Sequence, residues 1–227
     1  MTYSNETLKR LAKLKQKKHR ETERLFLAEG PALVEEANVP PEHLFAGPDA
    51  VKRLSTLTTP TGPIAVFPFL DVSGEELLRR SERVVFLHGV QDPGNVGAVI
   101  RAAHAFEAGV ALSIGTADLY NSKTVRATMG SIFHAPIVRD VHSLPFLEQA
   151  KTLGFTVAAA VPAGGEKPFS LPARKLVIVV GAEGGGLPED VISACQTATM
   201  IPSLAESLNA AVAASILLYE AYSRMLR

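Results

Sequence analysis

The chain has 227 residues, of which 47% are hydrophobic, and its 23 Lys and Arg balance its 23 Asp and Glu. This length allows one large domain or two small ones, and the composition excludes a disordered or fibrous protein. The N-terminal segment is not apolar, and no apolar run approaches the ~20 residues of a membrane span, so we expect neither a secretory signal nor a membrane partner. The single cysteine, Cys195, excludes an internal disulfide and a cysteine-rich metal site, which favours a cytoplasmic protein without a metal.

Charge is unevenly distributed along the chain. Residues 1–24 hold eight basic residues against three glutamates, a net charge of +5, so the remainder carries −5. The neutral total therefore does not exclude a nucleic-acid partner. Leu8, Leu11 and Leu14 recur at intervals of three, which predicts one short helix with an apolar stripe and outward-facing lysines. Two interpretations stay open: a helix face that is only solvated, or a face that contacts an anionic partner.

Residues 1–70 are expected to form a small α/β domain. Its predicted elements are a strand at 26–28, helices at 31–37 and 49–54, and a strand at 64–67. The stretch that follows, 71–83, is polar and charged, and we expect it to be a linker.

From residue 84 to the end, the pattern becomes regular. Apolar strands are predicted at 84–87, 110–114, 156–161, 176–180 and 199–201. Helices are predicted between and after them, at 96–106, 122–132, 144–153, 188–194 and 208–225. Strands rich in Val, Ile and Leu that alternate with helices indicate an α/β fold, a parallel sheet with helices on both faces. In such sheets, ligands bind beyond the carboxyl ends of the strands.

The first strand-end loop leads into an apolar helix with one isolated charge. Arg101 is the only charged residue between Asp92 and Glu107, and Asn95 is a plausible cap for the helix. An arginine among apolar residues is costly unless an anion or a carboxylate meets it. A structural salt bridge or a side chain that extends to water is the alternative to a functional role.

The second loop, 181–186, is rich in glycine and also has one charge. Glu183 is the only charged residue between Lys175 and Glu189, and four glycines around it let the backbone approach a ligand closely. The loop matches neither a dinucleotide-binding fingerprint nor a phosphate-binding P-loop. A plain glycine loop is the alternative.

The third loop follows the last strand. Glu206 is the only charged residue between Asp190 and Glu220, and Ser207 or Asn209 could simply cap the terminal helix. That helix is apolar nearly all round, which predicts that it is buried or lies in a subunit interface. Because three such loops are expected at one edge of one sheet, a composite site explains them better than three unrelated structural features.

These residues resemble the ordered signatures of the SpoU (TrmH-like) RNA ribose 2′-O-methyltransferases of the SPOUT superfamily. The matching segments are Asn95-x-Gly97-x-x-x-Arg101, then Gly181-Ala182-Glu183-Gly184-x-Gly186-Leu187, then Ile201-Pro202 followed by Glu206-Ser207-Leu208-Asn209. Residues 11–30 and 59–66 resemble the substrate-binding domain that precedes many of these enzymes. The resemblance therefore covers nearly the whole chain.

The resemblance implies an S-adenosylmethionine-binding methyltransferase domain at 84–227 with a C-terminal trefoil knot, S-adenosylmethionine as the cofactor and a homodimer as the working form. The family pattern assigns cofactor binding to Gly181, Gly186, Ile201, Pro202 and Leu208. It assigns the catalytic site to Arg101, Asn95, Glu183, Ser207 and Asn209.

The implied reaction is methyl transfer to a ribose 2′-hydroxyl of structured RNA. The two-domain build favours 23S-type ribosomal RNA, while transfer RNA or an antibiotic-resistance site on ribosomal RNA stays open. Because an arginine remains protonated in proteins, we expect Arg101 to clamp an RNA phosphate and stabilise the developing alkoxide. Proton transfer from the hydroxyl through Arg101, coupled to that phosphate, is the alternative. The side chains expected to contact RNA are Lys9, Lys13, Lys17, Lys18, Arg20 and Arg101.

Two other classes are weighed against this one. A non-catalytic RNA-binding protein on the same scaffold would be marked by loss of Arg101, Glu183 or Asn209, and all three are present. A dinucleotide-dependent oxidoreductase would need the glycine fingerprint that the second loop lacks.

Overall fold

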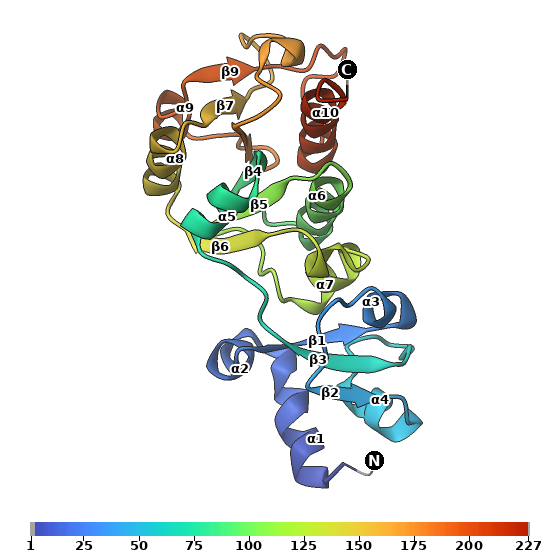
Figure 1. Ribbon diagram of the computed structural model, residues 1–227. Helices are drawn as coiled ribbons and strands as arrows, with labels where there is room; N and C mark the ends of the chain where they lie inside the picture. Colours follow the sequence, from blue (N-terminus) through green and yellow to red (C-terminus); the bar gives the residue numbers. More distant parts are fainter. Residues whose placement is uncertain (1–2, 227) are drawn as a thin grey trace.

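The computed structural model describes residues 3–226, in which a smaller N-terminal part packs against a larger C-terminal part (Figure 1). The N-terminal part is a small α/β unit, as expected. Its antiparallel sheet has the strand order β1-β3-β2, with β1 (Leu25–Glu29), β2 (His43–Phe45) and β3 (Ile64–Pro68). Its helices are α1 (Asn5–Ala12), α2 (Lys17–Glu23), α3 (Pro31–Glu35) and α4 (Pro48–Leu54).

The basic N-terminal segment forms two helices where one was expected. After α1 comes a short 3-10 turn at Lys13–Lys15, and Gln16 then adopts an extended backbone (φ −101°, ψ 134°) that separates the turn from α2. Leu11 and Leu14 are buried in the N-terminal core, so the predicted apolar stripe is confirmed although the helix is broken.

The C-terminal part contains a six-stranded parallel sheet, which confirms the predicted fold class. The strand order is β6-β5-β4-β8-β7-β9. The strands are β4 (Arg83–His88), β5 (Gly109–Ser113), β6 (Ile137–Val141), β7 (Thr156–Ala160), β8 (Leu176–Gly181) and β9 (Thr197–Thr199). Strand β6 was not predicted, and β9 begins two residues before the predicted strand.

Helices cover both faces of this sheet (Figure 1). They are α5 (Gly74–Arg80), α6 (Pro93–Ala105), α7 (Ser122–Ala127), α8 (Ser143–Thr152), α9 (Glu189–Ser193) and α10 (Ala210–Ser223), with 3-10 turns at Ser131–Phe133 and Pro168–Ser170. Side chains of β4 alternate between the faces: Val85 and Leu87 share a core with α6 and α10, whereas Val84 and Phe86 share one with α5 and α8.

The stretch predicted as a linker is largely structured. It contains α5, whose N-cap Ser73 accepts a hydrogen bond from the backbone N–H of Glu76. Leu77 and Leu78 of this helix are fully buried in the core on one face of the sheet. The helix was not predicted because only two of its seven residues face the core, which leaves the segment polar in composition.

The two parts of the molecule share one continuous apolar core. Phe26 of β1 lies 4.9 Å from Tyr120, and Phe67 of β3 lies 4.8 Å from Phe133, measured between ring centroids. All four side chains are buried in the same cluster as β4, α6 and α10. The N-terminal sheet is therefore packed directly against α7, the residue Tyr120 that precedes it and the 3-10 turn that follows it.

None of the helices within residues 3–226 has both the length and the apolar character needed to cross a membrane. The same residues hold no group of three His, Cys, Asp or Glu side chains placed to ligate a metal ion.

Candidate active site

The three charged loops meet beyond the carboxyl ends of β4 and β8. These strands are parallel neighbours in the middle of the sheet, and His88 pairs with Gly181 at their last register position. The loop after β4 leads to Asn95, the loop after β8 holds Glu183, and the segment after β9 ends at Asn209. The sheet therefore brings together residues that are far apart in the sequence.

Asn95, Glu183 and Asn209 form a closed hydrogen-bonded network. Nδ2 of Asn209 donates to Oδ1 of Asn95 at 3.0 Å and to Oε1 of Glu183 at 3.2 Å. Nδ2 of Asn95 donates to the same carboxylate oxygen of Glu183. One carboxylate oxygen thus accepts hydrogen bonds from two amides, and each motif of the family signature contributes one member.

Helix capping fixes two members of the network. Asn209 is the N-cap of α10, since its Oδ1 accepts hydrogen bonds from the backbone N–H groups of Ala211 (2.9 Å) and Val212 (3.2 Å). Asn209 therefore caps α10, as one interpretation expected, and its amide nitrogen also joins the network. The cap of α6 is Asp92, not Asn95 as expected, because Asp92 Oδ1 accepts a hydrogen bond from the Asn95 N–H at 2.8 Å. This leaves the Asn95 side chain available to the network.

Arg101 lies on the exposed side of α6 and does not join the network. Arg101 comes six positions after Asn95, which places its Cα about 9 Å further along the helix axis and roughly 120° around that axis from the Cα of Asn95. Within residues 3–226, no carboxylate lies within ion-pair distance of its guanidinium. The structural salt bridge that the sequence left open is absent from this part of the chain, so the guanidinium is available to an external anion.

The glycine loop after β8 is a tight turn with open space beside it. A Cβ on Gly181 would lie 2.3 Å from the carbonyl carbon of Gly186, so the two backbones touch and a side chain is excluded. Gly184 and Gly186 have positive φ angles of 80° and 64°, and no atom lies within 4 Å of where their Cβ atoms would be. The backbone of this loop is therefore open to a ligand.

The segment after β9 adds apolar surface and free backbone donors. Ile201 and Leu208 are half-buried, whereas Pro202 and Ser207 are exposed. In the described residues, the backbone N–H groups of Ile201 and Leu208 have no protein acceptor. Together with the glycine loop, these groups fit a ligand that has an apolar ring system and hydrogen-bond acceptors.

The expected RNA-contacting residues divide into two groups. The side chains of Lys9, Lys13, Lys17 and Lys18 are exposed. Arg20 is only 4% exposed, and its guanidinium donates to Leu14 O at 2.8 Å and pairs with Asp118 at 2.5 Å. We therefore revise the expectation for Arg20, because its charge is already used inside the protein.

Two further polar features near the site were not found from the sequence. His88, at the end of β4, contacts Ser143 at 2.9 Å through Nδ1. His104, one helical turn beyond Arg101, stacks on His134 with 4.5 Å between ring centroids, and burial together with the neighbouring His134 lowers the pKa of His104. Histidines on separate elements give no spacing signal, so no pattern in the sequence indicated either pair.

Comparisons with known proteins agree with this geometry. The SpoU rRNA Methylase family matches residues 82–219, and the MRM3-like substrate binding domain matches residues 5–83. The 23S rRNA (guanosine(2553)-2′-O)-methyltransferase RlmP of Bacillus subtilis is 34% identical, with 95% of each chain covered.

Solved structures extend the likeness to the fold. An AdoMet-bound rRNA methyltransferase from Sinorhizobium meliloti is 27% identical with a TM-score of 0.87, covering 100% of this chain and 98% of that one. An RNA 2′-O ribose methyltransferase is also 27% identical, with a TM-score of 0.78 and coverage of 100% and 98%.

The fold and the three joined loops define an S-adenosylmethionine-dependent RNA 2′-O-methyltransferase. The chain belongs to the SpoU rRNA methylase family and carries an MRM3-like substrate-binding domain ahead of the methyltransferase domain.

Proposed function

We propose that this enzyme methylates a ribose 2′-hydroxyl in 23S-type ribosomal RNA. The observation that carries the proposal is the intact Asn95–Glu183–Asn209 network, which joins all three motif loops. Further along α6, the guanidinium of Arg101 has no protein partner in residues 3–226. The Bacillus subtilis relative, which is named for a 23S rRNA nucleotide and covers both domains, supports the choice of RNA. Transfer RNA is the alternative substrate, and the site geometry alone does not distinguish the two.

S-adenosylmethionine supplies the electrophilic methyl group when it is bound. The residues that would hold it are Gly181, Gly186, Ile201, Pro202 and Leu208. The glycine loop offers backbone without side chains, and the segment after β9 offers apolar side chains and N–H groups that have no acceptor within residues 3–226. This donor set suits an adenosine that is recognised mainly through backbone groups.

Arg101 is the residue that we assign to the substrate. Its guanidinium stays protonated, so it is suited to pair with a phosphate and to stabilise a developing alkoxide on the ribose. Methyl transfer of this kind needs alignment of the attacking oxygen more than it needs a strong base. An exposed arginine without a competing carboxylate supplies such an anchor.

Glu183, Asn95 and Asn209 are assigned a positioning role. The Oε1 atom of Glu183 already accepts two amide hydrogen bonds, which hold the glycine loop against α6 and α10. Ser207 lies exposed immediately before this network, where its hydroxyl can reach a bound ribose.

The exposed lysines of the N-terminal segment are assigned to the RNA backbone. Lys9 and Lys13 belong to α1 and the turn after it, and Lys17 and Lys18 begin α2. Four exposed lysines on two neighbouring helical segments offer positive charge suited to phosphate contacts that carry no base specificity.

A homodimer is the proposed working form. Val212, Ile216 and Tyr219 of α10 are 47%, 39% and 57% exposed, and their spacing places them on one side of the helix. An apolar stripe of this kind is typical of a surface that another protein covers. Because α10 packs against α6, a second copy seated on this stripe would lie close to Arg101.

The trefoil knot is proposed for the segment that contains β8, β9 and α10. The chain passes from β8 across β7 to β9 and then returns to α10 on the opposite face. A Cβ on Gly165 would lie 2.6 Å from the carbonyl carbon of Thr199, and Glu166 pairs with Thr199 in a parallel bridge, so the segment after β7 lies alongside the end of β9. The support for the knot is the strand order, in which the chain passes beyond β7 to β9 before it returns to α10. We place the enzyme in the cytoplasm, where its proposed substrate is made.

The deciding experiment is a map of 2′-O-methyl groups in total RNA from cells with and without this gene. We expect one methylated position of 23S-type rRNA to disappear, and to return when the wild-type chain but not Arg101→Ala is supplied. A missing position in transfer RNA would replace the proposed substrate with the alternative. Unchanged methylation in every RNA would contradict the proposal.

A further inference from the structure

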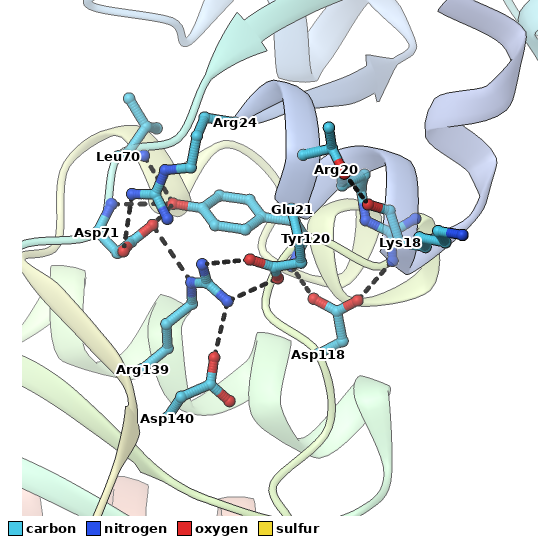
Figure 2. Close-up of polar contacts among 11 residues, drawn as sticks. Lys18, Arg20, Glu21, Arg24, Leu70, Asp71, Asp118, Tyr120, Arg139 and Asp140 are labelled. Atoms are coloured by element: carbon cyan, nitrogen blue, oxygen red, sulfur yellow. Dashed lines mark hydrogen bonds and ion pairs between the residues drawn. The ribbon is translucent and has the colours of Figure 1, made fainter.

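The segment that connects the two domains is hydrogen-bonded to a buried tyrosine of the methyltransferase domain. Figure 2 shows Tyr120 reaching the connecting residues Leu70 and Asp71. The Tyr120 hydroxyl accepts hydrogen bonds from the backbone N–H groups of Leu70 (2.6 Å) and Asp71 (2.9 Å) and donates to Asp71 Oδ1 at 2.7 Å. Every hydrogen-bonding position of one hydroxyl is therefore used to hold the chain where it leaves the N-terminal domain.

Arg139 of β6 joins the same point to the helix that carries the lysines. Its two terminal nitrogens contact the two carboxylate oxygens of Glu21 at 2.8 and 3.0 Å, and its Nε lies 3.3 Å from Asp71. Glu21 belongs to α2, one turn after Lys17 and Lys18. The side chain of Arg139 is only 11% exposed and that of Glu21 is 35% exposed, so this forked contact is partly shielded from water.

Stacked rings complete this contact, which we call the interdomain clamp (Tyr120, Asp71, Arg139, Glu21 and Phe69). The Phe69 ring lies 3.9 Å from the Tyr120 ring and nearly parallel to it. The guanidinium of Arg139 lies 4.8 Å from the Phe69 centroid, and that of Arg24 lies 4.6 Å from it. Planar groups that stack in this way restrict the rotation of one domain relative to the other as well as their separation.

Three further polar contacts lie around the apolar joint. Arg20 of α2 pairs with Asp118, and both side chains are buried, at 5% and 13% exposure. Arg126 donates to Thr56 Oγ1 at 2.8 Å, and His134 contacts Glu36 at 3.2 Å. Each pair joins one residue of the N-terminal domain to one of the methyltransferase domain. A rotation of either domain would break several of these contacts together.

The charges of the clamp are stable at neutral pH. Burial opposes ionisation of Asp71, but the hydrogen bond from Tyr120 and the charges of Arg139 and Arg24 outweigh it and hold the pKa of Asp71 below its usual range. Asp71 is therefore an anion between two cations. A charge that has left water needs its partners in place, so the arrangement favours one geometry over loosely related ones.

We propose that the interdomain clamp holds the N-terminal domain in one fixed orientation, and that this orientation selects the nucleotide to be methylated. The inference rests on the proposed function, because it assumes an RNA substrate. With the clamp closed, the distance from the surface formed by Lys17 and Lys18 to Arg101 is constant. The suitable substrate is then a structured RNA that presents a phosphate backbone and the target ribose at that distance. Arg139 and Tyr120 act as positioning residues, since neither reaches the reacting atoms.

The test compares Arg139→Gln and Tyr120→Phe, alone and combined, with the wild type and with a matched control. The control is Arg79→Gln, which removes an exposed arginine paired with Glu75 on the outside of α5. We expect the combined clamp variant to raise KM for the RNA and to methylate neighbouring nucleotides. We expect kcat/KM at the correct position to fall at least about tenfold, because small displacements of a reacting group are costly. S-adenosylmethionine binding should be unchanged in all variants, which shows that the methyltransferase domain is folded.

A distance measurement keeps the proposal testable if the clamp variants are unstable. Dyes are placed at Lys52→Cys and Lys167→Cys, one in each domain, in a chain that also carries Cys195→Ala. We expect the same narrow distance distribution with and without RNA in the wild type, and a broader one in Arg139→Gln. A wild-type distance that shifts on RNA binding, or clamp variants with unaltered KM and a single methylated nucleotide, would overturn the proposal. A wild-type enzyme that methylates no RNA would instead contradict the proposed function, while the distance measurement would still report on the clamp.

Discussion

The side-chain amide of Asn209 is bound at both of its ends, to the helix that it caps and to Asn95. Its oxygen accepts from the first N–H groups of α10, and its nitrogen donates to Asn95 Oδ1 at 3.0 Å. The start of the last helix and the first turn of α6 are thus joined through one planar group, although 114 residues separate the two asparagines. Each end of this amide can be removed separately.

Replacing Asn209 with Asp removes the donor end only. Aspartate caps a helix about as well as asparagine, so the cap should persist, while the lost hydrogen bonds to Asn95 and Glu183 should lower the free energy of unfolding by about 1 kcal/mol. The new carboxylate would face Glu183 without a proton between them, and we expect methylation to fall by roughly 10²-fold as the loops move apart. The control is Asn121→Asp, because Asn121 caps α7 in the same way, at 2.9 Å to Lys123 N, away from the network. Wild-type turnover in Asn209→Asp would refute the positioning role.

Arg101→Ala should abolish methylation while S-adenosylmethionine still binds. Because the guanidinium has no protein partner in residues 3–226, its loss should change the free energy of unfolding by no more than about 0.5 kcal/mol. Arg101→Lys should also fail, since an ammonium cannot reproduce a planar fork against a phosphate. Single-turnover methylation and calorimetry with the cofactor separate the two effects, and Arg174→Lys, another exposed arginine, serves as the control.

Lys17→Ala with Lys18→Ala should weaken RNA binding and reduce its salt dependence. Each phosphate contact that is lost lowers the slope of log K against log salt by about 0.7–0.9, so the double variant should lose roughly 1.5. Filter binding at several salt concentrations gives the slope, with Lys167→Ala as a control in the other domain. Arg20→Ala should behave differently: it leaves Asp118 without its partner and lowers the free energy of unfolding by about 1–3 kcal/mol. An unchanged slope in the lysine variant would leave those side chains as solvated surface only.

Ile216→Glu should produce a monomer. A charge in the middle of the exposed stripe on α10 would be buried without a partner if a second copy covered it. Light scattering coupled to size exclusion measures the mass, and methylation should be lost together with the dimer. Leu153→Glu is the control, because Leu153 is exposed to a similar degree (37% against 39%) but lies at the end of α8 on the other side of the sheet. A dimer that survives Ile216→Glu would move the proposed interface elsewhere.

Stability should decrease at both extremes of pH through the interdomain clamp. The folded-state pKa of Asp71 lies below the ordinary aspartate value of 3.8, so its contribution is present above pH 3.8 and is lost as the pH falls through the folded value. Burial and the adjacent Asp71 charge raise the pKa of Tyr120 above the ordinary tyrosine value of 10.0, so its contribution is present below pH 10.0 and is lost as the pH rises through the folded value. Denaturant titrations across pH measure both slopes. Asp71→Asn should flatten the acid slope and Tyr120→Phe the alkaline one.

The sequence was sufficient to predict most of the sheet and the loops of the candidate site. Four of the six parallel strands contain continuous Val, Ile, Leu or Ala, which is the pattern of a strand buried on both faces. Strand β6 was missed because Arg139 and Asp140 interrupt its apolar run and leave it with the character of a loop. Arg139 belongs to the interdomain clamp and Asp140 is next to it. The polar residues that serve the clamp are therefore the ones that prevented the strand from being predicted.

The contacts between side chains could not be predicted in the same way. Asn95 and Glu183 are 88 residues apart, and no local pattern reports that strand order brings their loops together. Arg20 stands in a run of basic residues, and only packing reveals that it turns inward while Lys17 and Lys18 face the solvent. Burial of a single charge in a basic segment depends on a partner, Asp118, that lies in the other domain.

The shared apolar core makes the two domains a single unit of folding, even though separate families describe them. A fragment that begins at β4 would leave Tyr120 and Phe133 without their aromatic neighbours Phe26 and Phe67. It would therefore expose an apolar surface to water and tend to aggregate. A substitution at Phe67 would for the same reason reduce activity by lowering the amount of folded enzyme, although the side chain touches neither RNA nor cofactor. The first 70 residues therefore carry part of the stability of the methyltransferase domain, and the substrate-binding domain cannot be exchanged for another without rebuilding the surface on which it rests.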